Sequence, residues 1–200
     1  MRNGYWRSIG VMAAVAAGLS LGPGSLVTRI GAMGLVEPQA SLAPYVPTPQ
    51  DVVERMLALA RVSKDDVVVD LGSGDGRLVV TAARQFGARG IGIDIDPARI
   101  AEGRANAAKA GVEALVEFRQ EDALQADVSK ATVVTLYVLS GSNVRLRPHL
   151  LGQLKPGARI VSHQFGMGDW APDKVDTFTD ANGTSRTLYL WTVGPNSPKP

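Results

Sequence analysis

A β-branched run passes directly into a glycine-rich loop at residues 67–76, which read Val67-Val68-Val69-Asp70-Leu71-Gly72-Ser73-Gly74-Asp75-Gly76. The run is typical of a buried strand, and the glycines permit a tight turn into the helix that we expect at residues 77–86. In open α/β sheets, ligands bind where the carboxyl end of a strand meets the segment that follows it. The loop is therefore the predicted ligand site.

Strands and helices alternate on both sides of this loop. A helix is expected from Pro49 to Val62, with Thr48 as its N-cap and Asp51 completing a capping-box pattern. Further helices are expected at residues 97–110 and 143–154, and strands at residues 90–93, 115–118, 132–139, 159–162 and 187–193. The alternation predicts an α/β fold with a doubly wound parallel sheet, and the β-rich C-terminus predicts an antiparallel edge.

The first 43 residues differ from the rest of the chain. Ile9 to Leu21 is an apolar run that follows two arginines, which is the pattern of a signal peptide. A membrane-spanning helix needs about 20 apolar residues, and here a Gly-Pro-Gly break ends the run earlier. Residues 1–43 are predicted to be a cleaved signal peptide, a membrane anchor with a linker, or a mere apolar extension. Residues 44–194 form the predicted ligand-binding domain, and residues 195–200 a disordered tail.

Composition excludes several classes of function. The chain has no cysteine and two histidines, so disulfides are excluded and no metal site is predicted. Its net charge of +2 comes from residues 1–43, which hold three arginines and one glutamate, so the remaining residues balance. Residues 44–200 carry no net charge, so they lack the broad positive potential that binds a phosphate backbone. No nucleic-acid partner is expected.

The chemistry of the loop points to one cofactor. Its glycines follow a G-x-G-x-G spacing (Gly72, Gly74, Gly76), whereas dinucleotide sites use G-x-G-x-x-G. Asp70, just before the loop, would repel a pyrophosphate and attract an amino group or a sulfonium. Asp94 ends the next strand, about 20 positions on, where an acid can hydrogen-bond both ribose hydroxyls. An amino acid joined to a ribose without phosphate describes S-adenosylmethionine.

Three more residues complete the predicted cofactor site. Asp122 follows the third strand, where its carboxylate could accept a hydrogen bond from an adenine amino group. Ala123 next to it and Ser73 in the loop are also expected to contact the cofactor.

The loop resembles that of class I S-adenosylmethionine-dependent methyltransferases. Three motifs resemble more narrowly the protein-lysine methyltransferases of the ATP synthase c-subunit and the adenine nucleotide translocase: Tyr45-Val46-Pro47-Thr48-Pro49, Gly74-Asp75-Gly76-Arg77-Leu78-Val79 and Trp170-Ala171-Pro172-Asp173. The resemblance spans about residues 44–175 and implies a Rossmann-like seven-stranded methyltransferase sheet. It also implies methyl transfer to a lysine of a membrane-associated protein, with Tyr45 and Thr48 in a segment that folds over the cofactor.

Other substrates stay open at this point. Ser140-Gly141-Ser142-Asn143 lacks the proline expected in this family after the fourth strand. Methylation of a membrane-associated small molecule or lipid is one alternative, and a non-catalytic module that binds S-adenosylmethionine is another. Because S-adenosylmethionine is made in the cytoplasm, a membrane-associated protein with a cytoplasmic catalytic domain is favoured over an exported one.

Candidates for the acceptor side lie at the ends of the fourth and fifth strands. Tyr137, Asn143 and His163 are the predicted catalytic residues, and Asp169 lies nearby in sequence. His163 is interpreted as a base or substrate contact, or else as a histidine hydrogen-bonded under the loop. Trp170 either walls the substrate pocket or caps the core. No acidic residue occurs from 130 to 168, which indicates a solvated helix face, or a basic patch for acidic lipid headgroups or an acidic partner.

Overall fold

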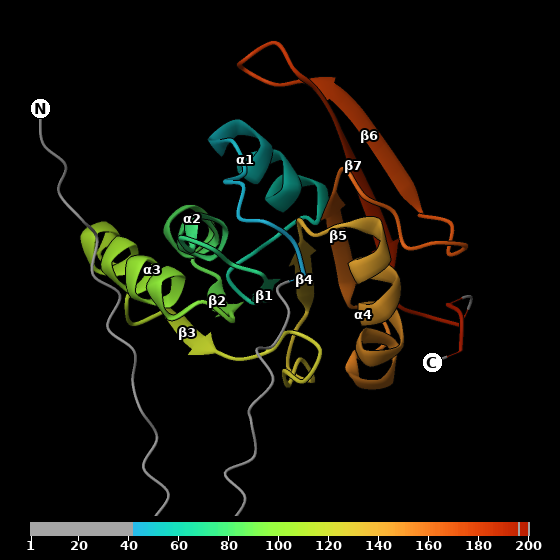
Figure 1. Ribbon diagram of the computed structural model, residues 1–200, viewed down its shortest axis with the longest axis horizontal. Helices are drawn as coiled ribbons and strands as arrows, with labels where there is room; N and C mark the ends of the chain where they lie inside the picture. The colour runs from blue at the N-terminus through green and yellow to red at the C-terminus, as the bar shows by residue number, and fades with distance from the viewer. Residues whose placement is uncertain (1–41, 196, 200) are drawn as a thin grey trace, which may run out of the picture. The chain divides into compact units, whose positions relative to one another are not determined.

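The computed structural model describes residues 42–195 and 197–199 (Figure 1). Its helices and strands, in chain order, are α1 (Gln50–Leu59), β1 (Val67–Leu71), α2 (Arg77–Phe86), β2 (Arg89–Asp94), α3 (Pro97–Ala110), β3 (Val116–Gln120), β4 (Val133–Leu136), α4 (Ser140–Gln153), β5 (Arg159–His163), β6 (Lys174–Thr179) and β7 (Ser185–Thr192).

The strands form one seven-stranded sheet in the order β3-β2-β1-β4-β5-β7-β6. β1 pairs in parallel with β2 on one side and β4 on the other, so the direction of winding reverses at β1. β5 continues the parallel part next to β4, whereas β7 and β6 add two antiparallel strands. The predicted doubly wound sheet with an antiparallel C-terminal edge is confirmed. A reversal of this kind places a ligand crevice at the carboxyl ends of the strands beside it.

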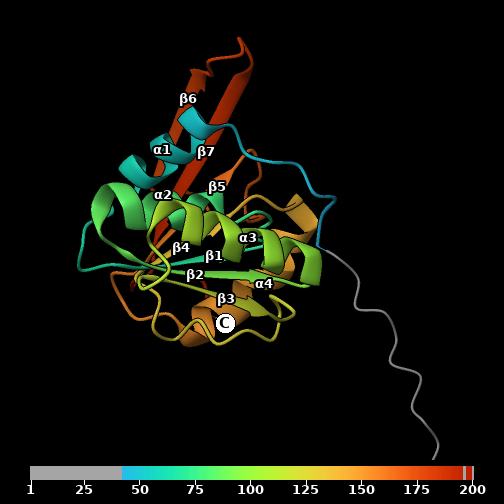
Figure 2. The ribbon, with the colours of Figure 1, turned by 90° about the vertical axis from the view of Figure 1, so that its left-hand side faces the viewer.

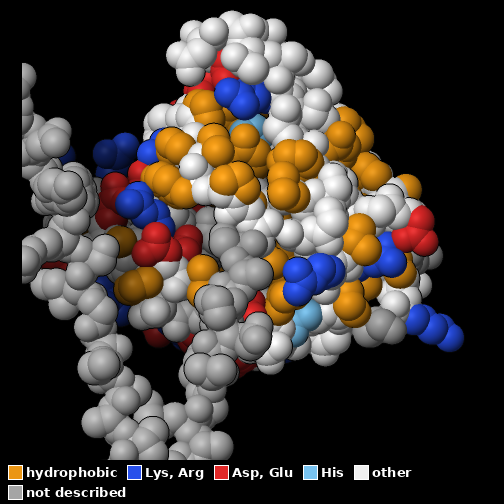
Figure 3. All heavy atoms as spheres, in the orientation of Figure 1, with side chains coloured by type: hydrophobic (Ala, Val, Ile, Leu, Met, Phe, Trp, Pro, Cys, Tyr) orange, Lys and Arg blue, Asp and Glu red, His pale blue; other side chains and the backbone are white. Residues whose placement is uncertain are grey.

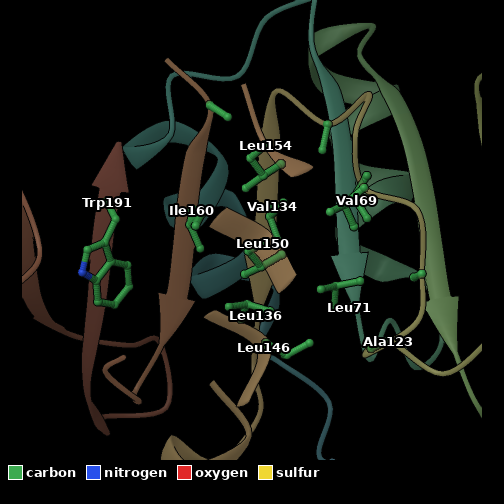
Figure 4. Packing of buried hydrophobic residues seen from close by; sticks show 14 of the residues in the cluster. Val69, Leu71, Ala123, Val134, Leu136, Leu146, Leu150, Leu154, Ile160 and Trp191 are labelled. Carbon is green, nitrogen blue, oxygen red and sulfur yellow. The ribbon is translucent and has the colours of Figure 1, made fainter. Parts of the chain in front are cut away.

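Helices cover both faces of the sheet: α1, α2 and α3 lie on one face and α4 on the other (Figure 2). Val69, Val134 and Ile160 project into a cluster with Leu146 and Leu150 of α4 (Figure 4). The neighbouring residues on the same strands belong to a second cluster with α1 and α2, which includes Val68, Val133 and Val161. Burial on both faces explains why these strands read as continuous apolar runs.

The start of α1 differs from the sequence prediction. Pro49 is the N-cap and no side chain caps the helix, so the predicted capping box at Thr48 and Asp51 is wrong. The Asp51 carboxylate instead accepts a 2.6 Å hydrogen bond from the Ala181 backbone N–H, in the turn between β6 and β7. The Asp51 side chain therefore makes a tertiary contact instead of the capping contact that the local pattern predicts.

Two further differences concern β4 and β6. β4 ends at Leu136, before the predicted limit of 139, and α4 begins at Ser140, before the predicted start at 143. Residues 137–139 are apolar, but they leave the sheet instead of extending the strand. β6 was not among the strands located by pattern, because its sequence KVDTFT is mostly polar. It lies at the sheet edge, where every residue is exposed or half-buried.

The N-terminal prediction falls on residues outside the described part, apart from Leu42 and Ala43. Within the described residues, no helix combines the length and apolar character needed to cross a membrane. At the other end, Ser197 N–H donates to the Gly194 carbonyl at 3.0 Å, and Gly194 N–H donates to the Ser197 hydroxyl at 3.0 Å. The predicted disorder of residues 195–200 stays a prediction.

Candidate active site

A cleft of about 540 Å³ lies at the carboxyl ends of β1, β2 and β4, next to the reversal of winding. Residues 42–48 form a strap along one side of it. Nine of the ten residues predicted to contact the cofactor line this cleft: Tyr45, Thr48, Asp70, Gly72, Ser73, Gly74, Asp94, Asp122 and Ala123. The sequence motifs therefore converge on one place, although their cofactor contacts stay predictions.

Hydrogen bonds to β2 fix the loop after β1. The backbone N–H groups of Gly72 and Ser73 donate to the Ile93 carbonyl at 2.8 and 2.9 Å. Gly74 N–H donates to the Asp94 carboxylate at 2.8 Å. Gly72 and Gly74 have φ values of 82° and 54°, in the left-handed region that favours glycine. The loop thus holds the Asp94 carboxylate beside its own backbone.

Gly76 is the one predicted cofactor residue that does not line the cleft. It is the N-cap of α2, with a φ of 75°. A Cβ atom at this position would lie 2.4 Å from the Phe118 ring and 3.2 Å from the Cα atom of Gly103. Gly76 therefore permits the close packing of α2, α3 and β3, and its predicted contact with the cofactor stays a prediction.

Asp70 carries an unusual charge environment. Its side chain is buried, and Thr135 donates a 2.7 Å hydrogen bond to one carboxylate oxygen. Burial raises the pKa of Asp70 to about 7, with the neighbouring carboxylates of Asp94 and Asp75 acting in the same direction and Thr135 against them. A cationic ligand group would favour the ionised form. The site is suited to a positive charge.

Asp75 and Arg77 form a pair that closes the loop. Arg77 Nε donates to the Asp75 carboxylate at 2.9 Å, and Arg77 Nη1 donates to the Thr48 carbonyl at 2.7 Å. Burial alone would raise the pKa of Asp75, but the hydrogen bonds from Arg77 bring it below its ordinary value. The carboxylate of Asp75 is thus the charged partner of Arg77 in the structure.

The strap is fastened on both sides of the cleft. The Tyr45 ring lies over the loop, since a Cβ atom on Gly74 would be 2.5 Å from its Cε2 atom. The Arg99 guanidinium of α3 lies 4.5 Å from the centroid of the same ring. At the other end, the Ser142 hydroxyl of α4 donates to the Leu42 carbonyl at 2.6 Å. Arg99 also lines the cleft, and the sequence analysis missed it because its position in α3 carries no local signal.

Of the three predicted catalytic residues, Tyr137 alone lines the cleft. His163 is fully buried behind it, with the two ring centroids 4.0 Å apart. Burial lowers the pKa of His163 to about 4, with Arg186 acting in the same direction and Asp180 against it. A group this weakly basic is poorly suited to take a proton from a lysine ammonium, so the predicted role as a base is not favoured.

Asn143 is also buried and does not line the cleft. Its side-chain amide donates to the Ser162 hydroxyl and to the Phe165 carbonyl, both at 3.0 Å. These bonds hold the end of β5 against α4. The catalytic roles of Tyr137, Asn143 and His163 stay predictions.

Asp169 and Trp170 lie away from the cleft. The Asp169 carboxylate is exposed and pairs with Arg147. Trp170 packs against Trp191, with ring centroids 5.9 Å apart, and its carbonyl accepts a 2.9 Å hydrogen bond from the Trp191 indole. Trp170 was predicted either to wall the substrate pocket or to cap the core, and the structure places it in the core.

The residues at the cleft fit S-adenosylmethionine. Asp70 offers a buried carboxylate for a cation, and the glycine loop leaves room for a close approach. The buried Ser73 hydroxyl has no hydrogen-bond partner within the described residues. Across residues 42–195 and 197–199, no cluster of histidine and acidic side chains is arranged to hold a metal ion.

Comparisons with known proteins agree with this geometry. The profile of the ANTKMT methyltransferase domain matches residues 70–174. The chain is 45% identical over 152 residues to a protein-lysine N-methyltransferase of Saccharolobus islandicus, an alignment that covers 76% of this chain and 94% of the relative. It is 34% identical over 130 residues to the adenine nucleotide translocase lysine N-methyltransferase of Mus musculus, covering 64% and 56%.

A solved structure is also similar. It is an RNA methyltransferase from Salinibacter ruber in complex with S-adenosyl-L-homocysteine, with 55% identity and a TM-score of 0.72. The match covers 78% of this chain and 98% of that one.

Proposed function

Because this chain belongs to the ANTKMT methyltransferase domain family and is an S-adenosylmethionine-dependent methyltransferase, we propose that its acceptor is the side-chain amine of a protein lysine. The observation that carries the proposal is the 45% identity to a protein-lysine N-methyltransferase over 94% of that relative's length.

The cleft divides into a cofactor side and an acceptor side. When bound, S-adenosylmethionine supplies a methyl carbon on a cationic sulfur. A neutral amine can attack this carbon in line with the sulfur, which leaves as a neutral thioether. Asp70 would hold the amino group of the cofactor, Asp94 its ribose, and Asp122 with Ala123 its adenine. These are the carboxylates and the loop that line the cofactor side.

The acceptor side is formed by apolar residues at the end of β4. Leu136, Tyr137, Val138 and Leu139 line the cleft there. Burial against apolar walls lowers the pKa of a lysine and favours the neutral amine that methyl transfer requires. The chain's own contribution is therefore to orient the amine, exclude water and release its proton by desolvation.

An RNA acceptor is the second candidate, because the similar Salinibacter ruber structure is described as an RNA methyltransferase. Binding of a phosphate backbone needs cationic side chains that are free to contact phosphates. Around the cleft, Arg77 is paired with Asp75, and Arg99 is paired with Glu102. These pairs favour the lysine acceptor over RNA.

A membrane-associated acceptor is the narrower proposal. Three large apolar side chains that line the cleft are exposed: Tyr45 by 48%, Val46 by 55% and Leu139 by 47%. Figure 3 shows hydrophobic side chains gathered on the face that carries the strap. They suit an acceptor segment whose lysine is flanked by apolar residues, and a catalytic domain that faces the cytoplasm would have access to the cofactor.

The basic patch considered for lipid headgroups supports this proposal less. Arg147 is paired with Asp169, and Arg159 is paired with Asp66. Residues 130–168 contain four cationic side chains besides Lys130. Two of these four, Arg147 and Arg159, are therefore neutralised by carboxylates outside that range.

Labelling separates these acceptors. The full chain is incubated with S-adenosylmethionine carrying a labelled methyl group, and with membrane proteins, soluble proteins, RNA and lipid extract in separate reactions. We expect labelled methyl-lysine in the membrane proteins and none with Asp94→Ala. Label in RNA or in lipid would overturn the lysine proposal, and methyl-lysine confined to soluble proteins would overturn the membrane-associated acceptor alone.

A further inference from the structure

The first turn of α4 stands beside the acceptor side of the cleft. α4 begins at Ser140, directly after Leu139, the last residue of the apolar wall that residues 136–139 form along the cleft. Residues 140–143, Ser-Gly-Ser-Asn, are also the segment that lacks the expected proline. Serine and asparagine side chains carry hydrogen-bond donors, which proline does not. These donors connect the turn to other parts of the chain.

Ser142 uses its hydroxyl for a contact outside the helix. A serine in the first turn of a helix commonly bonds to the local backbone, but within the described residues no side chain caps α4. The Ser142 hydroxyl instead donates a 2.6 Å hydrogen bond to the Leu42 carbonyl, which is 100 residues away in the chain. The bond is partly buried, so water would replace it poorly. It joins α4 to the first residue of the strap.

Asn143 holds the same turn of α4 from another side. Its side-chain amide donates to the Ser162 hydroxyl of β5 and to the Phe165 and Gly166 carbonyls, at 3.0, 3.0 and 3.3 Å. Asn143 and Ser162 are both fully buried. Successive side chains of a helix point about 100° apart, so Ser142 reaches the strap while Asn143 reaches the end of β5. The first turn of α4 is therefore a fixed support for the strap.

The strap itself has no regular structure. It runs along the carboxyl ends of the strands to α1 (Figure 2), and none of residues 42–48 belongs to a helix or a strand. Pro44 and Pro47 have no backbone N–H, and each disfavours the helical region in the residue before it. Such a segment is stiff, and it does not pair with the sheet. Its position therefore depends on the contacts near its two ends.

One end of the strap is fastened on the cofactor side of the cleft. The Arg77 guanidinium of α2 donates to the Thr48 carbonyl at 2.7 Å. The Arg99 guanidinium of α3 lies 4.5 Å from the centroid of the Tyr45 ring. Neither contact involves α4, so loss of the Ser142 hydrogen bond would leave this end of the strap in place.

The other end of the strap lies against the acceptor wall. Leu42 lines the cleft and packs against the buried cluster that contains Leu136 and Val138. Ser142 follows Leu139 within one helical turn, so its bond to Leu42 couples the position of the strap to that of the wall. The hydrogen bond therefore sets how far the start of the strap stands from the wall, which is the width available to an acceptor side chain.

We propose that Ser142 is a positioning residue for methyl transfer, whose hydroxyl holds the start of the strap so that the acceptor side chain fits between the strap and the end of β4. The inference rests on the acceptor side of the cleft as proposed above, and it does not require that the acceptor is a lysine. Ser142 does not line the cleft, so it acts through Leu42. Its effect falls on binding of the acceptor and not on binding of the cofactor.

A spectroscopic measurement tests the anchoring without turnover. The full chain is prepared with ¹³C-methyl leucine, and Leu42→Val identifies the Leu42 signals by their loss. We expect Ser142→Ala to move these signals toward the averaged position of an unfolded leucine, because the strap loses its fixed end. Ser140→Ala is the matched control, since Ser140 lies in the same turn, is exposed and makes no side-chain hydrogen bond within the described residues. Unchanged Leu42 signals in Ser142→Ala would overturn the anchoring.

Kinetics with the acceptor identified by labelling test the positioning role. We expect Ser142→Ala to raise the KM for the acceptor about fivefold, the worth of one hydrogen bond. The kcat and the affinity for S-adenosylmethionine should stay within about twofold of wild type. Ser142→Thr keeps the hydroxyl and should recover most of the loss. Arg99→Ala acts at the other end of the strap and should show the reverse pattern, with weaker cofactor binding and an unchanged KM for the acceptor.

The outcomes separate the positioning role from a merely structural one and from the proposed function. A wild-type KM for the acceptor in Ser142→Ala, or a loss shared equally by the acceptor and the cofactor, would overturn the positioning role. A loss that Ser142→Thr does not recover would overturn the role of the hydroxyl. Methyl label in an acceptor other than lysine would overturn the lysine proposal, and the same KM comparison with that acceptor would still decide the role of Ser142.

Discussion

Ionisation of Asp70 should control cofactor affinity across neutral pH. The pKa of this buried carboxyl is raised to about 7, and a cationic ligand binds its ionised form. The apparent affinity then follows the ionised fraction. That fraction is about one tenth at a pH near 6 and about nine tenths at a pH near 8. Affinity for S-adenosylmethionine should therefore rise about tenfold with pH across this interval.

The raised pKa of Asp70 also makes the stability of the ligand-free protein depend on pH. Stability falls with rising pH, whereas cofactor affinity rises. The folded-state pKa lies above the ordinary value of 3.8, so protonated Asp70 is favoured by folding. Stability is greatest below the ordinary pKa and decreases as the pH rises toward about 7, by at most about 4 kcal/mol. Asp70→Asn removes this cost. It should stabilise the ligand-free protein above neutral pH while weakening cofactor binding.

Calorimetry measures both the affinity and the protons released. Titrations in buffers of different ionisation enthalpy should show nearly one proton released per cofactor near pH 6 and almost none near pH 8. Thr135→Val removes the 2.7 Å hydrogen bond that opposes the rise in the pKa of Asp70, so the midpoint should move upward by up to about one pH unit. A wild-type affinity that is constant over this interval, or an unchanged pH dependence in Asp70→Asn, would show that Asp70 does not control cofactor binding.

Three further predictions concern packing around the loop. Gly74→Ala should weaken cofactor binding at least about tenfold by calorimetry, because the added Cβ would lie 2.5 Å from the Tyr45 ring. Gly111→Ala is the control for backbone strain alone, since Gly111 has a φ of 68° and open space around it. Arg99→Ala removes the cation–π contact with Tyr45 and should lower cofactor affinity about two- to fivefold, with unchanged affinity as the contrary result. Gly103→Ala should lower the urea midpoint although alanine favours helices, because its Cβ would lie 2.5 Å from the β3 phenylalanine ring; a higher midpoint would contradict this.

Much of the cofactor side was predictable from local sequence. The β-branched run at Val67 and the glycine loop specify a strand and a tight turn through backbone preferences that need no distant partner. Asp70 lies one residue before the end of β1, Asp94 ends β2 and Asp122 follows β3, and parallel strands end at the same edge of the sheet. Position along the chain was therefore enough to bring these carboxylates together.

Contacts between distant segments were not predictable in this way. Asp51 carries a capping pattern, yet it bonds to a turn 130 residues away. Gly76 resembles a ligand-binding glycine, but its closest neighbours are Phe118 and Gly103 of other elements. Competing partners of this kind exist only after the layers pack, so local preference cannot rank them.

The difference between what local sequence predicts and what tertiary contacts decide is clearest on the acceptor side of the cleft. From the sequence alone, Tyr137 and His163 could be placed near the carboxyl ends of the fourth and fifth strands, because an apolar run leads up to each residue. That Tyr137 faces the cleft while His163 lies buried and unpaired behind it follows from the packing of the folded chain. The reason is physical: burial depends on what covers a side chain, and here the cover comes from segments far away in sequence. The same burial sets the charge of His163, which no pattern of neighbouring residues contains.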